Sequence, residues 1–291
     1  KGMPTRSPQG VIYGAEPVVK ATYATLKEFP DRQLLGEDVI WIGNDDEGYF
    51  SSHRIFTRAT HANLGVYGEP TGKKLSYRVI ADCACRNNQV YDEWLVRDQG
   101  AIVRQLGLDP KKYAHKLIQE EGGIDKCAVP FNLDTPNDVP ADGIYIAPNI
   151  SKENTGVRYA EILKQIFNNE TNAIEKNYDR AIQQEQPGGF TGHGREEVAI
   201  FWNTFISAFP DSKFTIEHIS YTEEKDQAKK AAIRWSLVGS HSGKGNFGNP
   251  SNTPIYVMGI SHAEFGPRGI KNEWVLFDET IIWKQILMKT G

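Results

Sequence analysis

The sequence predicts an α+β protein that contains two tandem copies of one domain. When the 291-residue chain is compared with itself, residues match at an offset of 180 positions without a gap. Each matching segment has the pattern of one helix followed by strands that short turns separate. The composition, with 39% hydrophobic and 24% charged residues, is that of a globular protein rather than a disordered or fibrous one.

The matches of the repeat concentrate in residue types with particular structural roles. The step Phe29-Pro30-Asp31 aligns with Phe209-Pro210-Asp211. The other matches include His61 with His241, Gly65 with Gly245, Gly68 with Gly248, Pro70 with Pro250, Trp94 with Trp274, and Asp98 with Asp278. Because about one aligned position in five is identical and no gap is needed, we expect residue n to superpose on residue n+180 from 14 to 98.

Each copy is expected to begin with an amphipathic helix that ends at the Phe-Pro-Asp step, since proline stops a helix. Four strands rich in β-branched and aromatic residues follow. We expect them at residues 38–43, 53–62, 74–85 and 89–97 in the first copy and at 213–221, 230–242, 253–265 and 270–279 in the second. Short turns between consecutive strands favour an antiparallel meander over βαβ units.

The two copies differ at their edges. A long helical pattern over 157–184 precedes the second copy, and nothing similar precedes the first. We expect the helical segment 99–121 or the partner domain to replace this helix, because a bare sheet face would expose a large apolar patch. The predicted boundaries are a first domain at 1–121, an irregular linker at 122–156 and a second domain at 157–291.

Charge and cysteine content argue against several function classes. The chain has 33 Lys and Arg against 37 Asp and Glu, and a net charge of −4 does not favour binding to nucleic acid. No apolar stretch approaches the roughly 18 residues of a membrane span. Three cysteines do not suggest a disulfide framework. We therefore expect a cytoplasmic protein whose partner is a small apolar molecule, and neither nucleic acid nor a membrane.

Two motifs that occur in both copies resemble a known family. Residues 59–73 and 239–250 are similar to the Gly-Thr-His-Thr-Gly and Gly-x-Pro-Pro-Thr-Gly-Lys segments of SnoaL-like polyketide cyclases, in the nuclear transport factor 2-like superfamily. The second motif is Glu93-Trp94 with Asp98, repeated as Glu273-Trp274 with Asp278. The resemblance implies two tandem cone-shaped (cystatin-like) domains, each a curved antiparallel sheet around helices with an apolar pocket. It also implies that such domains pair through their sheets, within one chain or as a homo-oligomer.

The residues that polyketide cyclases use for catalysis are missing. The resemblance places the family's catalytic Asp at Leu95 and Val275, and its His at Ala81 and Ser261. None of these residues is a carboxylate or an imidazole that accepts a proton near neutral pH. Inherited cyclase chemistry is therefore not expected in either copy.

Side chains alternate between the two faces of a strand, and this alternation indicates which residues could replace the missing catalytic Asp and His. If positions 81 and 95 face the pocket, the same face of the first copy also carries Cys83, Cys85, Tyr91, Glu93 and Arg97, and the preceding strand adds His53 and His61. In this hypothesis Glu93 is the base, Arg97 or Tyr91 stabilises an oxyanion, and His61 or His53 carries a proton.

Three alternatives stay open for this first-copy set. His61 equally fits a structural hydrogen bond where a strand enters a turn, and Glu93 equally fits a surface ion pair with Arg97. A β-bulge would instead bring Asp82 and His262 to the pocket face of their copies. Cys83 and Cys85 lack a second Cys/His pair, so we expect ordinary cysteines and no metal.

The corresponding set in the second copy is less polar and predicts an apolar binding or packing site. Its members are Trp235, His241, Ser261, Glu273 and Phe277. The segment 243–248 matches a dinucleotide fingerprint, but Pro250 follows it instead of a helix that would hold a pyrophosphate. No cofactor is expected.

Two functional hypotheses follow. The first is a small-molecule enzyme of SnoaL-like type that uses cofactor-independent general acid/base chemistry, as an isomerase, lyase or hydrolase, on an apolar carbonyl or hydroxyl compound. The alternative is a non-catalytic module for ligand binding or assembly, in which the two copies form an internal pseudo-dimer.

Overall fold

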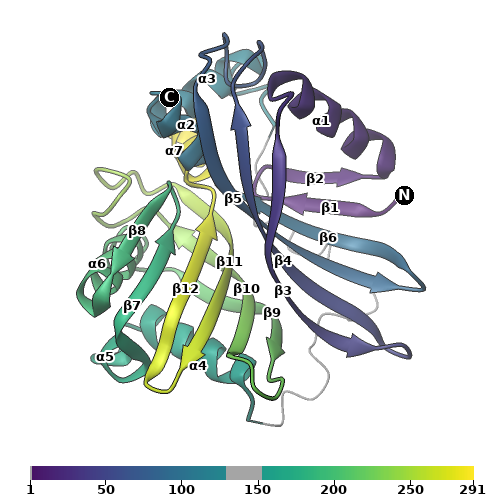
Figure 1. Cartoon of the computed structure of the whole chain (residues 1–291). Helices are drawn as coiled ribbons and strands as arrows, with labels where there is room; N and C mark the ends of the chain where they lie inside the picture. The colour runs from purple at the N-terminus through teal and green to yellow at the C-terminus, as the bar shows by residue number, and fades with distance from the viewer. Residues whose placement is uncertain (1, 129–152) are drawn as a thin grey trace.

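The computed structural model describes residues 2–128 and 153–291 and shows one six-stranded sheet in each half (Figure 1). The first half contains β1 (Pro4–Ser7), β2 (Gly10–Tyr13), α1 (Ala15–Glu28), β3 (Gln33–Asn44), β4 (Gly48–Thr60), β5 (Lys74–Arg86), β6 (Gln89–Arg97), α2 (Gln99–Gln105) and α3 (Pro110–Glu120). The second contains α4 (Thr155–Phe167), α5 (Ala173–Asn177), β7 (Tyr178–Gln186), β8 (Phe190–His193), α6 (Gly194–Ser207), β9 (Lys213–Thr222), β10 (Lys229–Ser240), β11 (Pro254–Gly266), β12 (Gly269–Phe277) and α7 (Glu279–Thr290). Most of the predicted linker lies outside the described residues.

Both sheets have the same strand order, which confirms the α+β class. The orders are β2-β1-β6-β5-β4-β3 and β8-β7-β12-β11-β10-β9. The four long strands of each sheet form the expected antiparallel meander. A hairpin adds two further strands, and because β1 runs parallel to β6 and β7 parallel to β12, each sheet is mixed.

The register of the strands confirms the gapless repeat. His53 pairs with Ala81 as Ile233 pairs with Ser261, and Val79 pairs with Arg97 as Gly259 pairs with Phe277. Even the irregular positions recur, because the register shift between Ala84 and Cys85 has its counterpart between Glu264 and Phe265. The offset of 180 residues therefore holds through the cores of both sheets.

The helix expected over 157–184 is wrong in its second part. α4 ends at Phe167, and Asn169 and Asn172 adopt left-handed backbone angles of φ 55° and 73°. Asparagine tolerates this conformation better than most residues and so ends the helix. After the short α5, the chain enters β7, which pairs with β12. As expected, no helix precedes the first copy among the described residues, since residues 4–13 form β1 and β2.

The two halves pack against each other through the faces of their sheets. An apolar cluster between the sheets contains Phe50, Ile80, Ala84, Trp94, Val96, Met258, Ile260 and Leu276. Equivalent arginines flank it, because Arg54 lies 3.5 Å from the centre of the Trp274 ring and Arg234 lies 3.6 Å from that of Trp94. This exchange of equivalent contacts is the pattern of a two-fold interface, made here within one chain.

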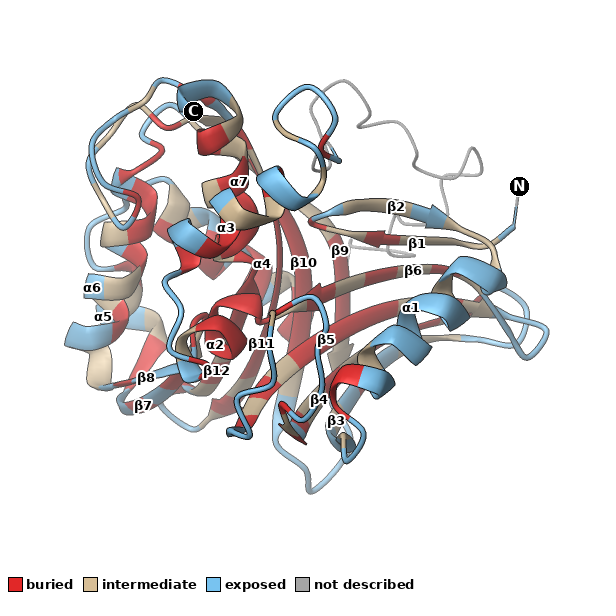
Figure 2. Ribbon diagram, turned by 90° about the horizontal axis from the view of Figure 1, so that it is seen from above, coloured by how far each residue is buried: buried red, intermediate tan, exposed pale blue. Residues whose placement is uncertain are grey.

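The helices cover the two sheets unequally. α4 and α6 bury their apolar residues in the core of the second half, including Tyr159, Leu163, Trp202 and Phe205. In α1 only Glu28 is buried, so this helix is pale blue or tan over most of its length (Figure 2). α3 packs against α7 of the second half through Ile118 and Leu287. Of the helices described, none is long and apolar enough to cross a membrane.

Candidate functional site

The two faces of the first sheet have different environments. Residues with the parity of Arg54 face the second sheet, and residues with the parity of His53 lie on the opposite side, which we call the inner face. Asp82 and His262 belong to the contact between the sheets: Asp82 accepts a bond of 3.2 Å from Arg234, and His262 bonds Ser52 and Arg54 at 2.7 and 3.0 Å. The bulge alternative for this pair is therefore wrong.

Glu93 lies on the inner face in a row of polar residues that crosses four strands. Ser51 pairs with Cys83, Cys83 pairs with Glu93, and Glu93 pairs with Thr5 of β1. The Thr5 hydroxyl donates to Oε2 of Glu93 over 3.1 Å, and no other hydrogen bond or ion pair holds this carboxylate among the described residues. Glu93 is half-buried and accessible. In particular, the predicted alternative of an ion pair with Arg97 is not formed.

His53 lies in the next row, where it pairs with Ala81, which in turn pairs with Leu95. Its Nε2 is 2.8 Å from Oγ of Ser51. Burial lowers the pKa of His53 below its usual 6.5, although the negative charges of Asp82 and Glu93 oppose this shift. The imidazole is therefore neutral at neutral pH and has one nitrogen to accept a proton and one to donate.

The cysteines of this face are thiols rather than thiolates. Burial, with a further contribution from Glu93, raises the pKa of Cys83 to about 12. Burial also raises the pKa of Cys85. Both cysteines are free, and no group of three His, Cys, Asp or Glu suited to a metal ion occurs within residues 2–128 or 153–291.

Arg97 is also on the inner face, one row beyond Leu95, and pairs with Val79. Its Nε is buried and has no hydrogen-bond partner among the described residues. A buried donor without a partner is costly, and Arg97 lies on the same face as Glu93, two rows away.

Two of the predicted first-copy residues lie elsewhere. The register shift next to Ala84 turns Tyr91 toward the cluster between the sheets, against which its ring packs, so strand parity placed it on the wrong face. His61 is eight residues from His53 along the chain, about 26 Å at the rise of a strand. It is fully buried and bonds Glu28 and Thr71, both at 3.1 Å. His61 therefore makes the structural hydrogen bond of the alternative prediction.

Two residues of the row escaped the sequence analysis. Ser51 precedes His53 by two positions and shares its face, so the parity argument that selected His53 also applies to Ser51. Thr5 could not be identified from the sequence, because β1 has only four residues and is too short for an alternating pattern to be recognised.

The equivalent carboxylate of the second copy is enclosed. Glu273 is fully buried and accepts hydrogen bonds from the hydroxyls of Tyr159 and Tyr178, at 2.7 and 2.8 Å, and from the amide of Gln184 at 2.7 Å. Burial raises its pKa, and these three donors oppose the shift. A carboxylate with this many partners and no access is a structural group.

The other predicted residues of the second copy also lie in packed surroundings. Trp235 donates to Oγ of Ser261 over 2.9 Å, and Phe277 stacks on Phe205 with 4.4 Å between ring centres. His241 is fully buried and bonds Ser251 at 2.9 Å, while its Nε2 has no hydrogen-bond partner among the described residues.

Aromatic rings fill the inside of the second copy, and non-aromatic residues take their equivalent positions in the first copy. Seven rings contact one another there: Phe167, Phe201, Trp202, Phe205, Phe214, Trp235 and Phe277. At the positions equivalent to six of these rings, the first copy has Ala21, Thr22, Thr25, Leu34, Ile55 and Arg97. The first inner face thus lacks the side chains that close the second.

The open end of the first inner face carries exposed apolar residues. Tyr23 of α1 is 69% exposed, and Trp41 of β3 is 46% exposed. Residues 99–121 or the partner domain were expected to replace the missing helix, but among the described residues neither covers this end of the face. α2 and Tyr113 of α3 complete the core at the opposite end, and the rest of α3 packs on α7.

Comparisons with known proteins give one family match and several similar solved structures. The model of the SnoaL-like polyketide cyclase family matches residues 157–286. None of the curated proteins compared matches the chain. AclR from Streptomyces galilaeus, a candidate hydroxylase, is a similar solved structure with 24% identity and a TM-score of 0.32, and the match covers 36% of this chain and 63% of AclR.

Two further solved structures are named as candidate polyketide cyclases. The SnoaL-like protein from Jannaschia sp. CCS1 has 13% identity and a TM-score of 0.39, with 46% of this chain and 95% of that protein covered. IdmH from Streptomyces antibioticus has 16% identity and a TM-score of 0.37, with 44% and 94% covered. The SnoaL-like family model thus matches most of the second copy, and the first copy repeats the strand order of that copy.

Proposed function

We propose that this protein is a cofactor-independent enzyme that acts on a small, largely apolar carbonyl or hydroxyl compound by general acid/base chemistry. The inner face of the first copy is the proposed active site, and the second copy is its packing partner. The observation that carries the proposal is the contrast between two equivalent carboxylates. Glu93 is accessible and held by one hydrogen bond, whereas Glu273 is buried under three.

The residues around Glu93 have complementary roles in this proposal. Glu93 accepts a proton from a carbon next to the carbonyl group, and its single bond to Thr5 leaves Oε1 to receive it. The negative charge that develops on the carbonyl oxygen is stabilised by Arg97, whose Nε has no partner among the described residues. Neutral His53 relays a proton, and return of the proton to a different atom completes an isomerisation.

A binding module without catalysis is the second candidate. It is favoured by Leu95 and Ala81, which occupy the family's catalytic positions on the same inner face. Side chains of this kind give an apolar ligand contact area and cannot move a proton.

The test is exchange of α-carbon protons for deuterium in a panel of small apolar ketones, followed by NMR. A positioned base contributes about 10²- to 10⁴-fold, so Glu93→Gln should lower exchange at least about a hundredfold. The matched control is Glu273→Gln, which removes the equivalent carboxylate from the packed copy and should leave the exchange rate per folded molecule unchanged. Full exchange in the Glu93→Gln variant, or equal loss in both, would favour the binding module.

A further inference from the structure

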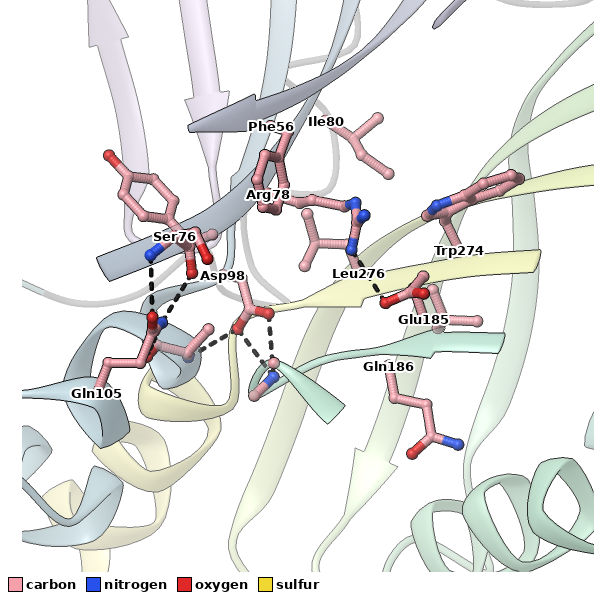
Figure 3. A pocket seen from close by; sticks show the side chains of 15 residues that line it. Phe56, Ser76, Arg78, Ile80, Asp98, Gln105, Glu185, Gln186, Trp274 and Leu276 are labelled. Atoms are coloured by element: carbon pink, nitrogen blue, oxygen red, sulfur yellow. Dashed lines mark hydrogen bonds and ion pairs between the residues drawn. The ribbon is translucent and has the colours of Figure 1, made fainter. Parts of the chain in front are cut away.

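A cavity of about 340 Å³ lies at the junction of the two halves, outside both cone interiors (Figure 3). Its apolar walls come from both sheets and include Phe56, Ile80, Trp274 and Leu276. A polar rim is made by Ser76 and Arg78 of β5 and by Glu185 of β7. The volume falls in the lower part of the range for ligand pockets, about 300–1,000 Å³.

The turn between β7 and β8 closes one side of this cavity. Gly188 and Gly189 have positive φ angles of 91° and 79°, which favour glycine. The backbone N–H of Gly188 donates to both carboxylate oxygens of Asp98, at 2.9 and 3.1 Å. Asp98 also caps α2 by accepting from the N–H of Ala101. One carboxylate thus fixes a wall of the second half to the first half.

The repeat shows how the opposite junction differs from this one among the described residues. Because the sheets pack with pseudo-two-fold symmetry, the opposite junction has the equivalent residues, and Ser76 and Arg78 correspond there to Tyr256 and Met258. The Tyr256 ring packs against the cluster between the sheets, and Met258 is buried within it. Two apolar contacts with the cluster thus stand where the open side has Ser76 and Arg78.

The polar groups of the cavity favour an uncharged ligand. Arg78 is already paired with Glu37 at 2.9 Å and with Glu185 at 3.1 Å, so it has no net charge to offer an anion. Backbone N–H groups bond both oxygens of Asp98, and Glu185 is paired with Arg78, so neither carboxylate of the lining is left for a cation. The Ser76 hydroxyl makes no side-chain hydrogen bond among the described residues, and strand parity turns it toward the second sheet together with Arg78 and Ile80.

We propose that this junction cavity is a second ligand site, for a neutral, mostly apolar compound of about two rings with one hydroxyl or carbonyl group. An apolar cavity of about 150 Å³ holds benzene, so 340 Å³ accommodates roughly two such rings. The polar group of the ligand bonds Ser76, and its rings lie against Ile80 and Leu276. The site is separate from the Glu93 row, which lies on the other face of the first sheet.

The test uses 2-naphthol as the probe on the full chain. We expect saturable binding, and intermolecular NOEs from naphthol protons to the methyl groups of Ile80 and Leu276. Ser76→Tyr introduces the residue that the opposite junction already accommodates, and it should weaken the affinity at least tenfold. Tyr256→Ser opens the opposite junction and should add one further binding site.

Three outcomes would overturn the proposal. They are the absence of saturable binding to the wild-type protein, NOEs that lead to Leu95 instead of Leu276, and unchanged affinity in Ser76→Tyr. Because the NOEs are measured on the wild type, they decide the matter even where a variant fails to fold. Glu93→Gln should bind naphthol at the junction normally, so a failure of the proposed enzyme function is distinguishable from a failure of this site.

Discussion

The two copies share strand order and register but use their inner faces differently. The second copy encloses its carboxylate and fills its interior with aromatic rings, whereas the first leaves a polar row half-open beneath a helix that buries only Glu28. Of the fifteen large hydrophobic residues that are exposed in the described part of the chain, only Phe190 and Ile200 belong to the second copy. The comparison teaches that one copy of a duplicated fold can supply rigidity while the other keeps an accessible face.

The largest expected effect comes from opening the filled copy. Trp202 is fully buried among aromatic rings, so Trp202→Ala should lower the free energy of unfolding by about 3–5 kcal/mol through lost contacts and a cavity. The equivalent residue of the first copy is the exposed Thr22, and Thr22→Ala should change stability by less than about 0.5 kcal/mol. Chemical denaturation measures both values. Similar losses in the two variants would contradict the contrast between the copies.

A second effect concerns the equivalent caps Asp98 and Asp278. Burial raises the pKa of Asp98 to about 6 and that of Asp278 to about 7, and the negative charge of Asp98 adds to the shift of Asp278. A carboxyl group whose pKa is raised by folding keeps its proton in the folded protein at pH values at which the unfolded chain has already lost it. Its stabilising contribution is complete below the unfolded value of 3.8 and is lost as the pH rises through 7.

Asp278→Asn should therefore become more stable than the wild type as the pH is raised from 4 to 8, by on the order of 4 kcal/mol. Asparagine keeps the acceptor that caps Thr280, whose N–H donates to Oδ1 over 2.9 Å. Asp98→Asn is the contrasting variant. The N–H of Gly188 donates to both carboxylate oxygens of Asp98, and in the variant an NH₂ group, which is a donor, replaces one of these two acceptors. Denaturation across this pH range tests the sign, and a constant difference between Asp278→Asn and the wild type would refute it.

The sequence predicted the repeat, the four long strands of each sheet and their register, because the Gly, Pro, His and Trp matches mark turns and strand ends. It could not predict the mixed sheets, since β1 and β2 have four residues each and β7 lies in a segment with helical periodicity. Local patterns carry no information on a parallel pairing between β7 and β12, which tertiary packing imposes.

The candidate site was predictable only where alternation is unbroken. Parity placed Glu93, His53 and Arg97 on the inner face, and the register bears this out. It failed for Tyr91 because one register shift reverses the side-chain direction. Parity also assigned His61 to the pocket, because it tells on which face of a strand a residue lies but not how far along the strand. Only the structure shows the bond of His61 to Glu28.

A small effect on stability, and the sharpest test of the comparison, is expected from filling the open copy. Thr22→Trp with Thr25→Phe gives α1 the rings that α6 buries at equivalent positions, Trp202 and Phe205. Because Thr22 is exposed and Thr25 half-exposed, the new rings displace no packed side chain, and the free energy of unfolding should change by less than about 1 kcal/mol. Ligand access to the Glu93 row should nevertheless be lost, together with deuterium exchange in the apolar ketones, whereas Thr22→Ser with Thr25→Ser should retain both. If the filled variant keeps full exchange, the substrate does not enter beneath α1, and the accessible face of the first copy is not the active site.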